Sequence, residues 1–216
     1  MIRSSSWFPG FLIDVFLDMR PVDVFAMIRH PLSYVGSLKR LRWGFRLEPL
    51  LQQPVLRARY LFDFQDREPQ RLTPLEASAW IWLAVNRYLL DVAARRSQVD
   101  LLFHEELSDK PVESIRACYA RVGLRWDDRK EARVRALTEG TTAAAPRAGV
   151  VHDLERRSRD IFAQSAALLT DEERAMVLRI TAPLSEVLYR DPALPDLSAE
   201  GQALAQRHHP GRLRAP

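Results

Sequence analysis

Near its start the chain carries apolar residues with the spacing of a one-faced helix. They recur every three or four positions, at Phe8, Phe11, Leu12, Val15 and Phe16. Pro21 ends this pattern, and residues 22–28, VDVFAMI, are mostly apolar like a strand. Pro31 suits the first turn of a second helix, which we expect to run to about Trp43 before Gly44 ends it. Helix, strand and helix in this order predict an α/β protein with a parallel sheet.

Two capping boxes predict the starts of further helices. Thr73 is followed three residues later by Glu76, and the apolar helix that begins there extends to about Arg95. Thr170 and Glu173 form the second box, which opens a helix with one apolar face. Both helices are long enough to bury that face in a core.

A second short strand is predicted at residues 99–104, VDLLFH, followed by an acidic turn at Glu105 and Glu106. The next helix begins near Pro111, and Gly123 ends it. Two strands among about six helices leave a parallel sheet with both edges unpaired. Either further strands escape recognition, or the remaining strands of the sheet lie outside this chain.

The length of 216 residues suits one domain with a real core and is too short for two ordinary domains. We expect this domain to occupy residues 1–192. Within it, residues 138–149, TEGTTAAAPRAG, read as a mobile loop or a linker inside the domain. Residues 193–216 read as a polar tail, which we expect to be disordered beyond Ala205.

Composition is that of a globular protein, with 47% hydrophobic and 28% charged residues. The formal net charge of +4 comes from 32 basic and 28 acidic residues. The basic residues are nearly all arginines, and their spread among carboxylates argues against a nucleic-acid partner. No apolar run is long enough to cross a bilayer and no secretory signal is recognisable, so we expect no membrane partner and a cytoplasmic location.

Cysteine and histidine predict no metal site. Cys118 stands alone, so a single chain can build neither a disulfide nor a thiolate site. The adjacent pair His208 and His209 lies among Pro, Gly and Arg, where a solvated end is the better interpretation.

The turn after the first strand carries the most suggestive chemistry. Arg29 follows that strand, and Ser33 and Ser37 share one face of the helix that begins at Pro31. In an open parallel sheet, ligands bind beyond the carboxyl ends of the strands. An arginine fork, hydroxyl groups and a helix start together make an anion site. The alternative is that Arg29 only caps the sheet edge.

The segment IRHPLSYVGSLKRL resembles the second nucleotide-binding motif of the sulfotransferase family, a strand followed by Arg, Asp or His, Pro and a later Ser. The resemblance continues through SAWIWLAVNRYLL, FHEELSDKPVESIRACYARVGL and LYRDP, and covers residues 8–192. It implies a P-loop NTPase-like α/β fold. It also implies transfer of a sulfuryl group from 3′-phosphoadenosine 5′-phosphosulfate (PAPS) to a hydroxyl or amine, with Arg29 and Ser37 holding the 3′-phosphate. In the basic segment ERRSRD near the C-terminus, Arg156, with Arg157 and Arg159, is the candidate that closes over the same phosphate, and the alternative is a solvated charged face.

Two parts of the family pattern are missing. The glycine-rich loop with a cation, which holds the 5′-phosphosulfate, has no counterpart, and residues 1–28 contain no histidine to act as a base. We therefore expect an N-terminally truncated sulfotransferase whose activity as this chain is open, and we assign no catalytic residue. His30 and His104 are given structural roles, and the acceptor substrate is not indicated.

The alternative hypothesis is a non-catalytic helical interaction module that reuses the sulfotransferase scaffold. It predicts no nucleotide binding and a partner, or a second copy of the chain, over the open sheet edge.

Overall fold

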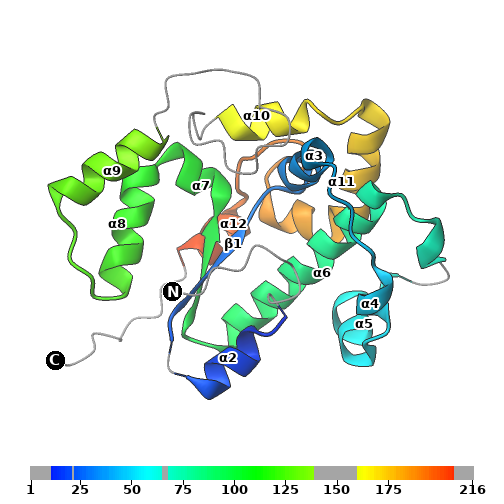
Figure 1. The fold of residues 1–216 in the computed structure, drawn as a ribbon, viewed down its shortest axis with the longest axis horizontal. Coiled ribbons are helices and arrows are strands. Elements are labelled where there is room, and N and C mark those ends of the chain that lie inside the picture. The colour runs from blue at the N-terminus through cyan, green and yellow to red at the C-terminus, as the bar shows by residue number, and fades with distance from the viewer. Residues whose placement is uncertain (1–10, 21, 65–67, 139–159, 207–216) are drawn as a thin grey trace.

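The computed structural model describes residues 11–20, 22–64, 68–138 and 160–206, and this part of the chain is mostly helical (Figure 1). The helical elements, in chain order, are α2 (Ile13–Met19), α3 (Pro31–Leu41), α4 (Glu48–Leu51), α5 (Pro54–Tyr60), the 3-10 turn η1 (Pro69–Arg71), α6 (Pro74–Arg95), α7 (His104–Asp109), α8 (Pro111–Arg121), α9 (Asp128–Thr138), α10 (Ile161–Ala166), α11 (Asp171–Leu188) and α12 (Ala199–Ala205). The strands are β1 (Val24–Ile28) and β2 (Val99–Phe103). None of the described helices is long and apolar enough to span a membrane.

The described residues form one parallel sheet of two strands, which confirms the α/β class. In its register Val24 pairs with Val99 and Ile28 pairs with Phe103, so both strands end at the same level. The long connection between them contains α3 to α6, and so much chain is typical of a crossover between parallel strands.

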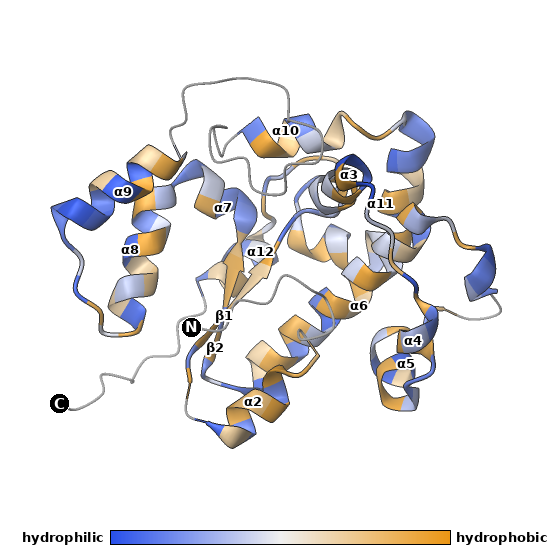
Figure 2. Ribbon diagram, in the orientation of Figure 1, coloured by the Kyte–Doolittle hydropathy of each residue, from blue (hydrophilic) through white to orange (hydrophobic). Residues whose placement is uncertain are grey.

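Helix α6 forms the centre of the core, and its start has the predicted capping box. The Thr73 hydroxyl accepts a hydrogen bond from the Glu76 amide, and the Glu76 carboxylate accepts one from the Thr73 amide at 2.8 Å. Pro74 occupies the first turn, where its missing N–H costs nothing. The helix is apolar over much of its circumference, as Figure 2 shows, because it is covered on several sides.

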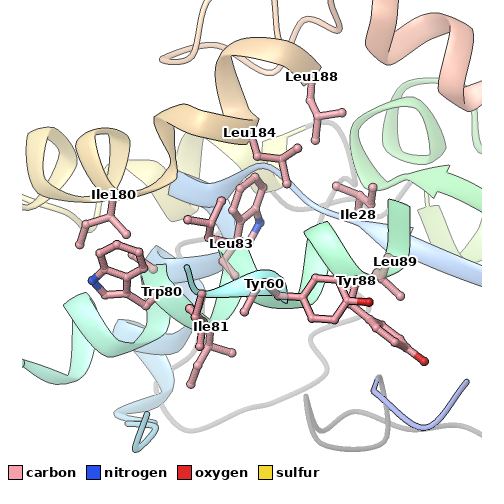
Figure 3. Packing of buried hydrophobic residues seen from close by; sticks show 14 of the residues in the cluster. Ile28, Tyr60, Trp80, Ile81, Leu83, Tyr88, Leu89, Ile180, Leu184 and Leu188 are labelled. Carbon is pink, nitrogen blue, oxygen red and sulfur yellow. The ribbon is translucent and has the colours of Figure 1, made fainter. Parts of the chain in front are cut away.

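Side chains of α6 and α11 meet in the middle of this core, as Figure 3 shows. The residues that fill this region share exposures of 6% or less and come from β1, α5, α6 and α11: Ile28, Tyr60, Trp80, Ile81, Leu83, Tyr88, Leu89, Ile180, Leu184 and Leu188. At about 25 cal/mol per Å² of buried apolar surface, each such side chain contributes roughly 1.5–3 kcal/mol. Helix α3 packs on both α6 and α11, so the core holds the helix that follows Arg29.

Helix α10 lies directly against α3. A Cβ placed on Gly36 would come within 2.0 Å of the Ser165 carbonyl oxygen, so only glycine allows this approach. The contact places Ser165 of α10 against Gly36, in the second turn of α3.

Helices α8 and α9 pair with each other and lie to one side of the body (Figure 1). An ion pair between Arg121 and the buried carboxylate of Asp100 ties α8 to β2. Helix α2 is held to α6 by Asp14, which contacts both Arg95 and Arg96.

Two predicted elements differ in detail from the structure. The predicted acidic turn after β2 is the short helix α7. Helix α3 ends at Leu41, because Arg42 adopts a left-handed conformation with a φ of 54° and caps it before Gly44 is reached.

The segment predicted as the start of a polar tail packs on the domain as far as α12. Leu197 is 6% exposed and pairs with Tyr189 in an antiparallel bridge, and the tight contact of Gly201 with the Leu188 carbonyl seats α12 on α11. The sequence did not reveal this because only Leu197 and Gly201 of residues 197–205 are buried. The loop predicted over residues 138–149, apart from Thr138 at the end of α9, and the end of the chain after Gln206 lie outside the described residues.

Candidate anion site at the carboxyl edge of the sheet

Arg29 follows the last residue of β1 and directs its guanidinium group across the start of α3. Its Nε donates a hydrogen bond to the Ser33 hydroxyl at 2.8 Å. Its Nη2 donates to the Ser165 hydroxyl of α10 at 3.3 Å. Both hydroxyls are nearly buried and can pass on hydrogen bonds of their own, because a hydroxyl that accepts from arginine keeps its proton for another acceptor.

The backbone that carries Arg29 is fixed at two adjacent points. Trp82 of α6 donates from its indole Nε1 to the Arg29 carbonyl oxygen at 2.7 Å. The Glu105 carboxylate accepts from the His30 amide at 2.9 Å through Oε1. The turn is therefore anchored to the core helix on one side and to the end of β2 on the other.

His30 has the structural role that the sequence predicts. Its Nδ1 accepts a hydrogen bond from the Leu32 amide and caps α3. The ring is fully buried and packs edge-on against Phe162 and Tyr189. Burial lowers the pKa of His30 to about 3, although the nearby backbone of Pro192 opposes the shift. His30 is accordingly neutral at neutral pH, which lets its Nδ1 accept.

Ser37 does not contact Arg29 through any hydrogen bond described in the structure. Its hydroxyl donates to the Tyr34 carbonyl oxygen at 2.7 Å, one turn back along α3. The side chain is half-buried, unlike that of Ser33, which is fully buried. Of the two serines of α3, the one that contacts the guanidinium group is thus Ser33, and the role of Ser37 at an anion stays a prediction. Arg156 lies outside the described residues.

His104 and Glu105 follow β2, next to the Arg29 turn. The His104 Nδ1 lies 3.3 Å from the Ser108 hydroxyl. Burial, with a second contribution from the positive charge of Arg29, lowers the pKa of His104 to about 4. Burial raises the pKa of the Glu105 carboxyl, and the His30 amide that it accepts from opposes this. We call these groups the carboxyl-edge cluster: Arg29, Ser33, His104, Glu105 and Ser165.

The carboxyl-edge cluster consists mainly of hydrogen-bond donors, which are groups that can bind an anion. No group of three or more His, Cys, Asp or Glu in the described part of the chain is placed to hold a metal. Glu105 is the cluster's one carboxylate, and its oxygens already accept from the His30 amide and from the Tyr189 hydroxyl at 3.4 Å. The guanidinium group and the two hydroxyls of the cluster are donors of the kind that phosphate and sulfate groups bind.

Sequence reasoning named Arg29 and Ser37 as the anion-binding pair and Ser33 as a further hydroxyl on the same helix face, and it did not point to the residues that complete the cluster. Ser165 lies 136 residues from Arg29, and no local pattern marks it. Glu105 was expected in an acidic turn, but the sequence did not indicate that its carboxylate accepts a hydrogen bond from the His30 amide.

Comparisons with known proteins identify no relative: no protein-family model matches the chain, and no curated protein and no solved structure matches it significantly.

Proposed function

We propose that this chain binds PAPS through the carboxyl-edge cluster and belongs to a sulfotransferase that acts on a hydroxyl or amine acceptor. The observation that carries the proposal is the position of Arg29. It stands at the carboxyl end of a parallel strand and hydrogen-bonds a serine hydroxyl of the following helix, with a second hydroxyl delivered by α10. The P-loop-like fold of the family is part of this proposal, and the parallel pairing of β1 and β2 is compatible with it.

In the proposed complex Arg29 binds the 3′-phosphate as a two-pronged donor. The anchors on its backbone, Trp82 and Glu105, keep the guanidinium group in place before the ligand arrives. Preorganisation of this kind lowers the entropy lost on binding. Ser37 joins only if its hydroxyl rotates away from the Tyr34 carbonyl, which costs about 0.5–1.5 kcal/mol.

Binding and turnover are separate expectations. The 216 residues contain no glycine-rich phosphate loop with a cation, so we expect this chain to bind the nucleotide with little sulfuryl transfer. Much of the acceleration in such reactions comes from groups that stabilise the negative charge on the transferred group. In the carboxyl-edge cluster, Arg29 is the residue that can stabilise negative charge in this way.

Calorimetry with adenosine 3′,5′-bisphosphate tests the proposal, with adenosine 5′-monophosphate as the ligand that lacks the 3′-phosphate. We expect the bisphosphate to bind more tightly. Arg29→Ala should weaken it about 10- to 100-fold, because charge-assisted hydrogen bonds each contribute about 1.5–3 kcal/mol. Arg46→Ala is the matched control, since it removes the same charge from a side chain that is 82% exposed and lies outside the carboxyl-edge cluster. Equal affinity of Arg29→Ala and the unmodified chain for the bisphosphate would remove the proposed site.

Ser33→Ala and Ser37→Ala separate the two hydroxyls of α3. The direct bond from Arg29 to Ser33 predicts a loss of affinity for Ser33→Ala through a misplaced guanidinium group. Ser37→Ala should have the smaller effect, because the Ser37 hydroxyl already donates to Tyr34.

A second candidate function, a non-catalytic interaction module, is favoured by one observation on β1. Met27 points away from the core and is 48% exposed, although it lies within a strand. Light scattering on the purified chain tests this alternative, because an interaction through the face of β1 between copies predicts a dimer. A monomer that binds the bisphosphate contradicts it.

A further inference from the structure

Two neighbouring strand ends carry the same local arrangement. At the end of β1, Arg29 hydrogen-bonds the hydroxyl of a serine four residues later, Ser33. At the end of β2, His104 contacts the hydroxyl of Ser108, also four residues later. The last residues of the two strands are paired in register, so the two basic side chains start from the same edge of the sheet.

Among the described residues, the charge that acts on the His104 ring is the positive charge of Arg29, from the turn between β1 and α3. Glu105, on the same helix as His104, directs its oxygens to the His30 amide and the Tyr189 hydroxyl. Further along this segment, the positive charge of Lys110 acts on the Glu106 carboxyl. The imidazole is therefore neutral while the carboxyl-edge cluster holds no anion, since its pKa lies near 4.

We propose that His104 is a second binding group for the anion held by Arg29, and that in mildly acidic solution it takes up a proton from solvent as that anion binds. This inference rests on the proposed function, because it concerns the same phosphate group. A dianion beside Arg29 reverses the sign of the field at the ring, and an imidazolium then faces a negative neighbour instead of a positive one.

Ser108 can accommodate both protonation states. A neutral ring can accept from the Ser108 hydroxyl at Nδ1 and keep its proton on Nε2. When Nδ1 gains the proton, the hydroxyl rotates and becomes the acceptor, and Nε2–H donates to the anion. On the Nδ1 side of the ring, the switch therefore needs only the rotation of the Ser108 hydroxyl.

Calorimetry at pH 7.5 and pH 5.5 on the full chain and on His104→Gln provides the first test, with adenosine 3′,5′-bisphosphate as the probe. The protonation of the ligand's own phosphates affects both proteins equally and cancels in the ratio of their affinities. The quantity compared is the affinity of the unmodified chain divided by that of His104→Gln. If the titration midpoint of His104 in the complex is about pH 6, this ratio should be about fourfold larger at pH 5.5 than at pH 7.5. A ratio that stays constant while both proteins bind overturns the inference and leaves the proposed function standing.

Nuclear magnetic resonance of the unmodified chain gives a second test that does not depend on a variant that folds. The Cε1–H signal of His104, assigned through the backbone, is followed against pH with and without the bisphosphate. We expect the titration midpoint to rise by one pH unit or more in the complex, and to stay unchanged with adenosine 5′-monophosphate. An unchanged midpoint in a chain saturated with bisphosphate overturns the inference, and the absence of any binding overturns the proposed function on which it rests.

Discussion

The contact between α3 and α10 yields a sharp prediction, because it rests on a single missing side chain. In Gly36→Ala the new Cβ would lie 2.0 Å from the Ser165 carbonyl oxygen and 2.7 Å from its carbonyl carbon. Neither atom belongs to a flexible side chain, so the backbone of α10 itself has to retreat. An ordinary contact between such atoms is 3.4 Å or longer, which means a displacement of more than about 1 Å.

Two effects of opposite sign determine how much Gly36→Ala changes the free energy of unfolding. Replacing glycine by alanine inside a helix stabilises that helix by about 0.8–1.0 kcal/mol. Overpacking a close contact costs about 1–3 kcal/mol, and a clash between backbone atoms belongs at the upper end. We expect a net loss of about 1–2 kcal/mol in the free energy of unfolding, which lowers Tm by roughly 2–8 °C in a domain of this size.

Urea unfolding followed by circular dichroism measures this loss, and calorimetry measures its effect on the site. Because the shift of α10 lengthens the bond from Arg29 to Ser165, binding of adenosine 3′,5′-bisphosphate should weaken as well. Adding Ser165→Gly to Gly36→Ala should restore neither property, since the clash is with the carbonyl group and not with the hydroxyl. A Gly36→Ala chain as stable as the unmodified one, or more stable, would refute the close packing of these helices.

Three further predictions concern the anchors around the site and the sheet. Trp82→Phe keeps the ring in the core but removes the donor to the Arg29 carbonyl, so we expect a loss of about 1–2 kcal/mol in urea unfolding and weaker bisphosphate binding in calorimetry. Asp100→Asn removes the buried charge that pairs with Arg121 and should cost about 2 kcal/mol in the same unfolding assay. The folded-state pKa of His30, about 3, lies below its unfolded value of about 6.5, so the stability it contributes is complete above pH 6.5 and is lost as the pH falls toward 3. Unfolding free energies at pH 7.5 and pH 5 should differ by about 2 kcal/mol from this residue, and His30→Asn, which retains a capping side chain, should lose that part of the difference.

Local sequence signals predicted the elements that form the core. The capping boxes at Thr73 and Thr170 mark the starts of α6 and α11, and the proline at Pro31 marks the start of α3. In each case the signal and the structure concern the same few residues, because a cap satisfies the free amides of its own helix. The ends of both strands were predicted within two residues, because a short apolar run is itself the local signal of a buried strand.

Helix α9 escaped prediction because it has no apolar face to recognise. None of its residues is buried, and ion pairs of Glu131 with Arg116 and Arg135 support it instead. The carboxyl-edge cluster was predictable only in part for a different reason. Arg29 and Ser33 lie on adjacent turns, whereas Ser165 and Glu105 reach them through tertiary packing that no sequence period encodes.

The long connection between the two strands has a consequence for how the chain reaches this structure. Residue 24 pairs with residue 99, so the ladder can form only after the intervening helices have collapsed into place. Loop closure over such a distance is slow, whereas the 22-residue helix α6 depends on local contacts. We expect amide protection in refolding experiments to arise first in α6 and last in β1, and an intermediate that has gained its helices but not its ladder should not yet recognise any nucleotide.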